Sequence, residues 1–351
     1  MKRKLLLLTL LIGFAFWVAG CSSSSSEVKS DEKPQAPVTL GENDFEIGQN
    51  DDNTLTIEKY TGTAKNIVIP SAIHGLKVTV ITSYAFRGKG LTGVVIPDTV
   101  HTIGAEAFAG NPALTKVTLG NGVKVIGDKS FARTALRSVV IPNSVTDIGN
   151  EAFYSGNIGG GAIKEITFGK SVRFIGVNAF GANQIRELTL PASLREILMG
   201  TFSGNRIEAL IIPDGVTVIR SRPASVSFEQ QFSEAIVASF GGGGGQTTGA
   251  FKDNKIEYLS IPASLAKRTD NYQGETTAGI ADGTFANNKE LTCIVLPAGM
   301  DDRAMAGNFE DALVNFWRNQ NRAAGAYMKR GPIWTKVTDD EANKFLQEIK
   351  K

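Results

Sequence analysis

Apolar and polar positions alternate over short stretches along most of this chain, and the same stretch returns about every 22 residues. Each copy reads L-x-x-V-x-I-P, then V-x-x-I-G, then two further residues and A-F. Aligned on the phenylalanine, eight copies end at Phe86, Phe108, Phe131, Phe153, Phe180, Phe202, Phe251 and Phe285. A period of this length is typical of a solenoid, because one unit is too small to bury its own apolar face.

The first segment of each copy predicts a short strand, since its β-branched residues alternate between an inward and an outward side. The first segment occurs nine times, once more than the phenylalanine: proline follows it in seven cases, and Gly120 and Gly169 follow it in the other two. The second segment, as in residues 123–127, predicts another extended piece that ends at a glycine bend. The phenylalanines then stack as a ladder, each contributing about 1.5–3 kcal/mol on burial before entropy.

Both ends of the array carry different patterns, which predict the caps that an open solenoid requires. Before the first copy, a β-hairpin is predicted by the alternation of Phe45, Ile47, Leu55, Ile57 and Tyr60 around a turn at residues 51–53. After Pro297, Phe309, Leu313, Phe316 and Trp317 fall on one helical face. A hairpin over residues 327–334 follows, and a capping box at residues 338–341 opens a last helix that turns Phe345, Leu346 and Ile349 inward. We interpret these aromatic residues as cap core rather than as ligand contacts.

The I-P, V, I-G, A-F and L spacing resembles the BspA-like bacterial branch of the leucine-rich repeat family, over residues 67–297. The resemblance implies a mainly β repeat solenoid, a right-handed coil with a parallel concave sheet. The predicted organisation is then an N-terminal β cap at 41–66, eight repeat units at 67–297 and a C-terminal α/β cap at 298–351. Several members of this branch are surface proteins of host-associated bacteria that attach to fibronectin, to epithelial cells or to other bacteria.

The N-terminus predicts export. Lys2-Arg3-Lys4 precede an apolar run from Leu5 to Val18, which is too short for a membrane span of about 20 residues and suits a signal peptide. Val18-Ala19-Gly20-Cys21 resembles the lipobox of bacterial lipoproteins, which implies cleavage after residue 20 and lipidation of Cys21; an ordinary signal peptide followed by cysteine is the alternative. The serine- and proline-containing residues 21–40 predict a flexible tether.

Composition and charge narrow the classes of function. The formal net charge is +2, and removal of the first twenty residues takes away three positive charges, so the body gives no sign of nucleic-acid binding. Cys293 is the only other cysteine, which leaves no disulfide framework once Cys21 is acylated. We therefore expect a monomer that core packing between repeats stabilises, attached to a membrane through its N-terminal lipid.

Residue types that carry chemistry do not form a recognisable site. His74 and His101 lie in the first coils, far from Cys293, so a cysteine–histidine pair is not expected, and no spacing suits a metal. Gly241–Gly245 lacks the Gly-Lys-Ser/Thr of a phosphate loop and is interpreted as a linker. Cys293 is expected to face the concave side as a partly covered, inert thiol. The sequence thus predicts no enzyme, no cofactor and no metal.

The outward strand positions are the first candidate for binding another protein. A row of small and β-branched side chains, bordered by charged ones, suits protein contact, although strand propensity alone also explains it. The candidates are Val95, Thr118, Val140, Thr167, Thr189, Ile211, Tyr258 and Ser260.

Two insertions are the second candidate, near residues 221–248 and 267–279. Both are expected between the second extended segment and the A-F pair of adjacent units, and therefore side by side on one flank. Their apolar and aromatic residues are candidate contacts, and tolerated loops are the alternative: Phe228, Phe232, Phe240 and Tyr272.

Two functions stay open at this point, and both are binding functions. The first is a lipid-anchored, surface-exposed protein of the outer membrane that binds a protein ligand, an adhesin for host matrix such as fibronectin or for host cells as the resemblance implies. The second is a periplasm-facing envelope scaffold or interaction lipoprotein.

Overall fold

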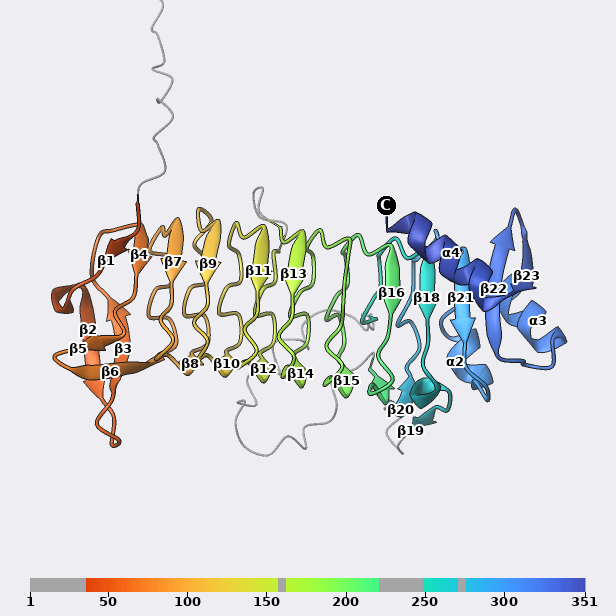
Figure 1. Ribbon diagram of the computed structural model, residues 1–351, viewed down its shortest axis with the longest axis horizontal. Coiled ribbons are helices and arrows are strands. Elements are labelled where there is room, and N and C mark those ends of the chain that lie inside the picture. The colour runs from red at the N-terminus through yellow and green to blue at the C-terminus, as the bar shows by residue number, and fades with distance from the viewer. Residues whose placement is uncertain (1–35, 157–161, 221–248, 271–275, 351) are drawn as a thin grey trace, which may run out of the picture. The chain divides into compact units, whose positions relative to one another are not determined.

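Stacked coils of about one repeat each build the folded unit, Ala36–Lys351, of this computed structural model (Figure 1). The structure describes residues 36–156, 162–220, 249–270 and 276–350. The first segments of the repeats form short strands that pair in parallel with the same segment of a neighbouring coil, as Val94 does with Ile67 and Val117. These strands are β4 (Asn66–Val68), β7 (Gly93–Val95), β9 (Lys116–Thr118), β11 (Ser138–Val140), β13 (Glu165–Thr167), β16 (Ala209–Ile211), β18 (Tyr258–Ser260) and β21 (Cys293–Leu296).

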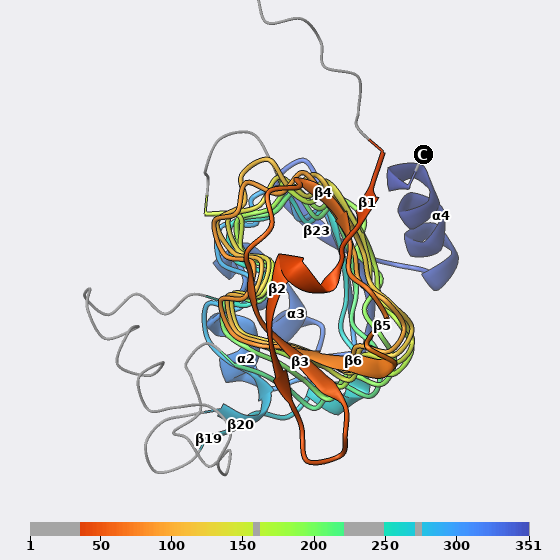
Figure 2. The same ribbon diagram turned by 90° about the vertical axis from the view of Figure 1, so that its left-hand side faces the viewer.

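The second segments form a further series of parallel strands, as the glycine-terminated pattern predicts. Its members are β6 (Leu76–Ile81), β8 (Thr102–Ile103), β10 (Val125–Ile126), β12 (Asp147–Ile148), β14 (Phe174–Ile175), β15 (Glu196–Ile197), β17 (Val218–Ile219) and β20 (Thr276–Ile280). A glycine follows β8, β10, β12 and β14, where the coils approach closely: a Cβ on Gly127 would lie 2.7 Å from the carbonyl carbon of Gly104. Seen end-on, the coils nearly superpose (Figure 2).

The predicted phenylalanine ladder is confirmed, and it is longer than the eight repeats. Neighbouring rings stack with centroids 4.8–5.8 Å apart and planes within 21° of parallel. Tyr60 of the N-terminal cap stacks on Phe86, and Phe309 stacks on Phe285 at the other end. Phe309 therefore extends the ladder, whereas the sequence pattern placed it on a helix.

A second ladder, of buried asparagines, runs beside the rings and was not predicted. Each asparagine follows its phenylalanine by three residues and joins its own coil to the preceding one. Asn205, for example, donates to the carbonyls of Phe180 and Phe202 at 2.9 and 3.0 Å and accepts from the Ile185 N–H at 3.0 Å. The same bonds recur at Asn111, Asn183, Asn254 and Asn288.

Two tight turns flank the A-F pair of most coils and adopt positive φ. In the second of them, Gly88, Gly110 and Gly204 have φ between 64° and 66°. Ala182 occupies the equivalent place with φ 55°, a conformation that costs a residue with a Cβ about 1 kcal/mol or more. The turn is required at this place because the segments before and after it must both reach their strand positions in the stack of coils.

The N-terminal cap is the predicted hairpin, formed by β2 (Phe45–Gln49) and β3 (Leu55–Tyr60), with β3 continuing the second series alongside β6. A 3₁₀ turn, η1 (Glu42–Asp44), precedes the hairpin, and β5 (Ala72–Ile73) pairs with β6. The strand β1 (Val38–Thr39) pairs with β4, and Leu40 is buried. Residues 38–40, expected in the tether, thus belong to the folded unit.

The C-terminal cap contains α2 (Asp302–Ala306), α3 (Asp311–Asn319), the hairpin β22 (Gly325–Arg330) and β23 (Ile333–Val337), and α4 (Asp339–Ile349). Leu313 and Trp317 of α3 are buried, and the predicted hairpin pairs Arg330 with Ile333 across its turn. The hairpin continues the first series of strands, because β22 pairs antiparallel with β21.

The second insertion enters its repeat elsewhere than predicted. Ile280 of β20 pairs with Ile219 of β17, so Ile280 is the isoleucine of that unit's V-x-x-I segment. The turn η2 (Ala263–Leu265) supplies the first apolar residue, Leu265, which is buried. The insertion thus lies inside the second segment, where β19 (Thr269–Asp270) pairs antiparallel with β20. The expectation that both insertions enter at one common point is wrong.

Candidate protein-binding face

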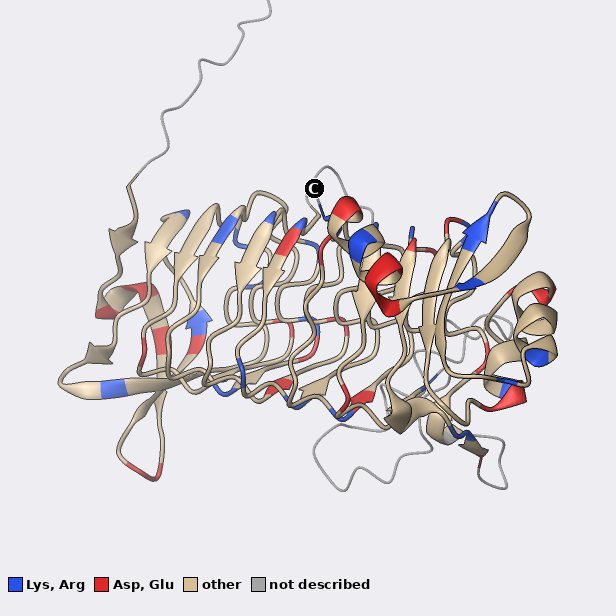
Figure 3. Ribbon diagram, turned by 45° about the vertical axis from the view of Figure 1, so that its right-hand side comes forward, with Lys and Arg blue, Asp and Glu red and all other residues tan. Residues whose placement is uncertain are grey.

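The outward side chains of the first series of strands form a continuous surface, which we call the strand face: β4, β7, β9, β11, β13, residues 187–189 and β16. Its central row contains most of the predicted candidates. Val95 is half-buried; Thr118, Thr167 and Thr189 are exposed; Val140 and Ile211 are 66% and 46% exposed. The neighbouring row exposes Lys116, Ser138, Glu165 and Glu187, and charges of both signs are interspersed over the unit (Figure 3).

Helix α4 covers the strands that follow β16. In Figure 1 it crosses the last strands of the first series, and in Figure 2 it lies outside the outline of the coils on the side of that series. Tyr258 and Cys293, which occupy outward positions of β18 and β21, pack with Ala342 and Leu346 of α4 and are 4% and 0% exposed. The expectation that Tyr258 lies on the open surface is therefore wrong, and Cys293 is fully rather than partly covered. Ser260 is half-buried.

Local sequence explains why α4 forms and why it docks. Thr338 Oγ1 accepts a hydrogen bond from the Glu341 N–H at 3.2 Å, and Glu341 Oε2 accepts one from the Thr338 N–H at 2.9 Å, so the predicted capping box is confirmed. Leu346 is buried, and Phe345 and Ile349 pack against the covered strands. This apolar stripe turns α4 onto the sheet.

Burial under α4 also changes the acidity of the covered groups. It raises the pKa of the Cys293 thiol from 9.0 to about 12, and it raises the pKa of Tyr258. A thiol with so high a pKa carries almost no thiolate at neutral pH, and the thiolate is the nucleophile. Cys293 is therefore suited to packing rather than to covalent chemistry.

A groove of about 750 Å³ lies where the strand face meets the end of α4. Its floor is formed by residues 186–190 and the neighbouring coil, and Ile349 and Lys350 close one side. Arg186 and Glu208 form a bidentate ion pair at its border, with Nη2 2.8 and 2.9 Å from the two carboxylate oxygens. Thr189 and Ile211, both predicted candidates, line the same groove.

The strand pairing is interrupted at this groove. Within the described part of the chain, residues 187–189 make only one isolated bridge, between Glu187 and Ala209, although they occupy the strand position of their repeat. Phe168 stands in the preceding coil where most repeats have isoleucine or leucine. Its ring lies edge-on to Phe180 and Phe202, at centroid distances of 5.4 and 6.4 Å. Among the described strands, the pairing is likewise absent between β9 and β11, where Leu119 stands at the position of Phe168, so the ring alone does not explain the interruption.

Several predicted residues lie outside those that the structure describes: Cys21, Phe228, Phe232, Phe240 and Tyr272. Over the described ranges, no group of three or more histidine, cysteine, aspartate or glutamate residues is arranged to hold a metal ion. Nor does any helix within those ranges have the length and apolar character needed to cross a membrane.

The sequence contains an indication that the last helix, α4, packs over the later strands. In the row that bears lysine, serine and glutamate in earlier coils, Tyr258 and Cys293 are the large or apolar exceptions, and the predicted last helix has an apolar face of its own. Two unpartnered apolar surfaces in neighbouring segments indicate contact between them.

Comparison with known proteins found several similar solved structures. Solved structures similar to the chain include a leucine rich repeat protein of T. pallidum (24% identity, 52% of this chain, 81% of that one, TM-score 0.43) and a leucine-rich repeat protein of Bacteroides ovatus (20% identity, 71% and 68%, TM-score 0.46). A leucine rich cell surface protein of Faecalibacterium prausnitzii is 21% identical over 76% of this chain and 90% of that one, with a TM-score of 0.27. No curated protein matches significantly.

The repeated sequence identifies the family to which the chain belongs. A family model described as the BspA type leucine rich repeat region matches in six copies, over residues 78–180 and 159–272. These matches include the A-F pairs, the strand face of the middle coils and the asparagine ladder. Because they cover more than half of the chain, this protein belongs to the BspA type leucine-rich repeat family.

Proposed function

We propose that this protein is a lipid-anchored protein of the bacterial cell surface that binds other proteins along the strand face, as an adhesin for host extracellular matrix or cells. Membership of a leucine-rich repeat family indicates a role in protein interaction. The observation that carries the proposal is the uncovered central row of the strand face, which exposes Val140 and Ile211 within a line of threonines.

The composition of this row suits a protein ligand. Apolar and hydroxyl side chains alternate along it, and the border contains both lysine and glutamate, so neither a polyanion nor a polycation is favoured. An isolated exposed apolar residue is ordinary, but a row of outward groups at one strand position supplies a continuous contact surface. Affinity then comes from many modest contacts, and several copies in one membrane add avidity.

The groove beside α4 supplies the deepest contact on this surface. A side chain that enters it meets Leu190 and Ile211 as well as the polar Thr189. Binding anchors that fill such a recess contribute more than contacts on a flat surface, because they are more fully removed from water. We place the centre of the interface here, next to the loosely paired residues 187–189.

Anchoring rests on the sequence of the N-terminus. The resemblance of Val18–Cys21 to a lipobox and the tether that follows it support attachment through lipid on Cys21. Two or more acyl chains hold a protein firmly to a bilayer, at roughly 0.8 kcal/mol for each buried methylene. The tether gives the strand face freedom to reach a ligand away from the membrane.

Binding to immobilised fibronectin, measured by surface plasmon resonance, tests the ligand and the face together. We expect Thr167→Lys and Thr189→Lys each to weaken binding at least tenfold, because each places a long charged side chain in the central row. Thr217→Lys, the same change at an exposed residue that precedes β17 in the second strand series, is the matched control and leaves binding unchanged. Equal binding by all three variants would refute the strand face as the binding surface.

Protease treatment of intact cells tests the location. Loss of the protein from protease-treated cells that remain unbroken supports surface display. Protection until the envelope is opened contradicts it and favours the periplasm-facing scaffold.

A further inference from the structure

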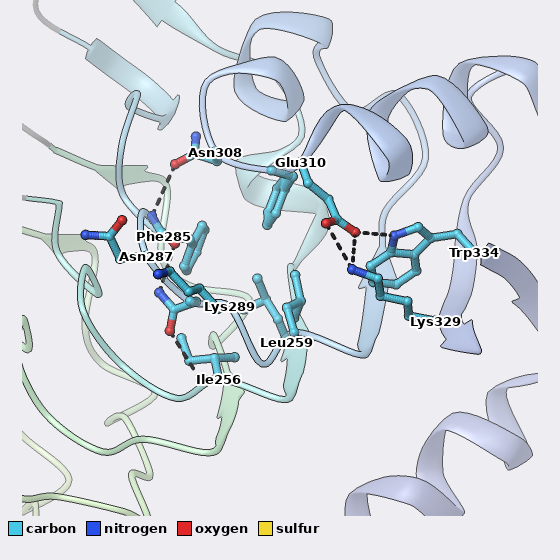
Figure 4. A pocket seen from close by; sticks show the side chains of 12 residues that line it. Ile256, Leu259, Phe285, Asn287, Lys289, Asn308, Glu310, Lys329 and Trp334 are labelled. Atoms are coloured by element: carbon cyan, nitrogen blue, oxygen red, sulfur yellow. Dashed lines mark hydrogen bonds and ion pairs between the residues drawn. The ribbon is translucent and has the colours of Figure 1, made fainter. Parts of the chain in front are cut away.

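A second pocket, of about 320 Å³, lies between the last coil and the C-terminal cap (Figure 4). Ile256, Leu259, Phe285 and Leu291 supply apolar walls, and Lys289 and Glu310 add charge. Glu310 is held in place, since Trp334 Nε1 donates to its Oε1 at 2.7 Å and Lys329 Nζ lies 2.7 Å from the same oxygen. The pocket exists because the repeat pattern stops after this coil.

In five coils of the array, the equivalent place is filled by an asparagine side chain of the next coil. There the first residue of the L-x-x-V-x-I segment donates its backbone N–H to the asparagine Oδ1, and the asparagine Nδ2 donates to the carbonyl of the phenylalanine that comes before that residue in the chain. We call this N–H and this carbonyl the amide slot. Its N–H to Oδ1 distances are 2.9–3.2 Å in five slots, filled by Asn111, Asn183, Asn205, Asn254 and Asn288.

In the last coil the amide slot consists of the Leu291 N–H and the Phe285 carbonyl, and both residues line the pocket. None of the described residues accepts a hydrogen bond from the Leu291 N–H. By contrast, Leu114, whose next coil has threonine at this place, donates to the backbone carbonyl of Asn111 at 2.9 Å.

The Phe285 carbonyl accepts a hydrogen bond from one asparagine side chain instead of two. It accepts from Asn288 Nδ2 of its own coil at 2.9 Å, whereas the Phe251 carbonyl accepts from both Asn254 and Asn288, at 3.1 and 3.0 Å. The slot thus presents one free donor and one free lone pair, the two groups to which a carboxamide bonds in every filled slot.

The cap brings an asparagine close but does not fill the slot. Asn308 accepts from the Phe285 N–H at 3.3 Å and donates to the carbonyls of Ala281 and Ala304 at 3.0 and 2.9 Å. Figure 4 shows Asn308 bonded to Phe285, and its amide apart from the Glu310 carboxylate. Its amide is committed to the cap, so the slot of the last coil is left to an outside group.

We propose that this pocket binds the side-chain carboxamide of an asparagine presented by a partner polypeptide. The asparagine Oδ1 accepts from the Leu291 N–H, and its Nδ2 donates to the Phe285 carbonyl. The pocket volume exceeds that of a carboxamide alone, which leaves room for the adjoining peptide backbone beside Lys289 and Glu310. This site is separate from the strand face, so it stands or falls independently of the proposed function.

The slot discriminates among related groups by geometry. A primary amide presents its oxygen and its NH2 along one edge, which matches the two slot atoms. A trans secondary amide, as in a peptide bond or an N-acetyl sugar, points its N–H and its oxygen in opposite directions. An aspartate has no donor at neutral pH and sets a negative oxygen against the Phe285 carbonyl. Asparagine is therefore selected over all three.

Titration of the purified full-length protein, labelled with 15N-leucine, tests the proposal by NMR. The probe is acetyl-Ala-Asn-Ala N-methylamide, and the matched controls carry Asp or Ala at the centre. The Leu291 amide resonance is identified by its loss in Leu291→Ile. The Leu91 amide, whose slot Asn111 already fills, is the internal control.

We expect the asparagine peptide to shift the Leu291 amide resonance in a saturable manner, with the Leu91 resonance unmoved. The aspartate and alanine peptides are expected to bind at least tenfold more weakly. Equal shifts with all three peptides, or no shift at Leu291, would overturn the proposal.

Discussion

Removal of one asparagine from the buried ladder should destabilise the array out of proportion to the few atoms lost. We choose Asn205→Ala, because Asn205 is 5% exposed and lies in the middle of the ladder. The change deletes its hydrogen bonds to the Phe180 carbonyl, the Phe202 carbonyl and the Ile185 N–H. The consequence depends on which of these three groups keeps another partner.

The two carbonyls keep one. Phe180 O still accepts from Asn183 Nδ2 at 3.1 Å, and Phe202 O still accepts from Asn254 Nδ2 at 2.9 Å. The Ile185 N–H, which belongs to a residue with 0% exposure, loses its acceptor. An orphaned buried donor costs about 1–3 kcal/mol and each lost hydrogen bond about 0.5–1.5 kcal/mol. We therefore expect the free energy of unfolding to fall by about 2–4 kcal/mol.

Urea unfolding followed by circular dichroism gives the change in free energy, and hydrogen exchange of the Ile185 amide reports the local effect even if the array unfolds in several steps. The control is Asn343→Ala on the exposed side of α4, which should change stability by less than about 0.5 kcal/mol. If Asn205→Ala matches this control, or if Ile185 exchange is unaltered, the ladder does not stabilise the array as argued.

Three further predictions follow from the coil geometry and from the cover formed by α4. Gly127→Ala should lower the free energy of unfolding by at least about 2 kcal/mol, seen as a lower urea midpoint, because its Cβ would lie 2.7 Å from backbone atoms of the preceding coil. Ala182→Gly should raise it by about 0.5–1 kcal/mol, because φ is 55° there; a lower midpoint would contradict the assigned turn. The raised pKa of Cys293 means that the unfolded chain loses this proton first, so its contribution is complete below pH 9 and is lost as the pH rises toward 12. Between pH 8 and pH 10.5 the urea midpoint should therefore fall more for the unaltered protein than for Cys293→Ala, and parallel curves would exclude the effect.

The periodic features were predictable from sequence because the same short-range rule acts in every coil. Inward strand positions, glycine bends and the A-F pair recur at nearly constant spacing, so the two strand series and the phenylalanine ladder could be predicted. The asparagine ladder recurs less regularly: Thr134 replaces one member, and an insertion displaces another. Because of these exceptions, the asparagine that follows the phenylalanine by three residues was not recognised as part of the repeat.

Features that depend on contacts between residues far apart in the chain could not be positioned in the fold from the sequence alone. The last helix and its apolar face were predicted, but which strands it covers follows from the path of the whole C-terminal cap. The second insertion was misplaced because it separates Leu265 from Ile280, which together form one V-x-x-I segment. The predicted candidates of the central row up to β16 lie on the open face, whereas Tyr258, a candidate in the neighbouring row, lies beneath α4.

The asparagine ladder has a direction, which bears on how the chain is made. In five coils, the backbone N–H that starts the strand segment is bonded by an asparagine that comes later in the sequence, as Ile185 is by Asn205 and Ile207 by Asn254. During synthesis from the N-terminus, each of these coils therefore lacks its final acceptor until the next coil has emerged. These coils are therefore completed in the order in which they are synthesised. A chain that stalls or is truncated among them ends in a coil whose backbone N–H lacks its asparagine acceptor. Leu291 marks the place where that succession stops.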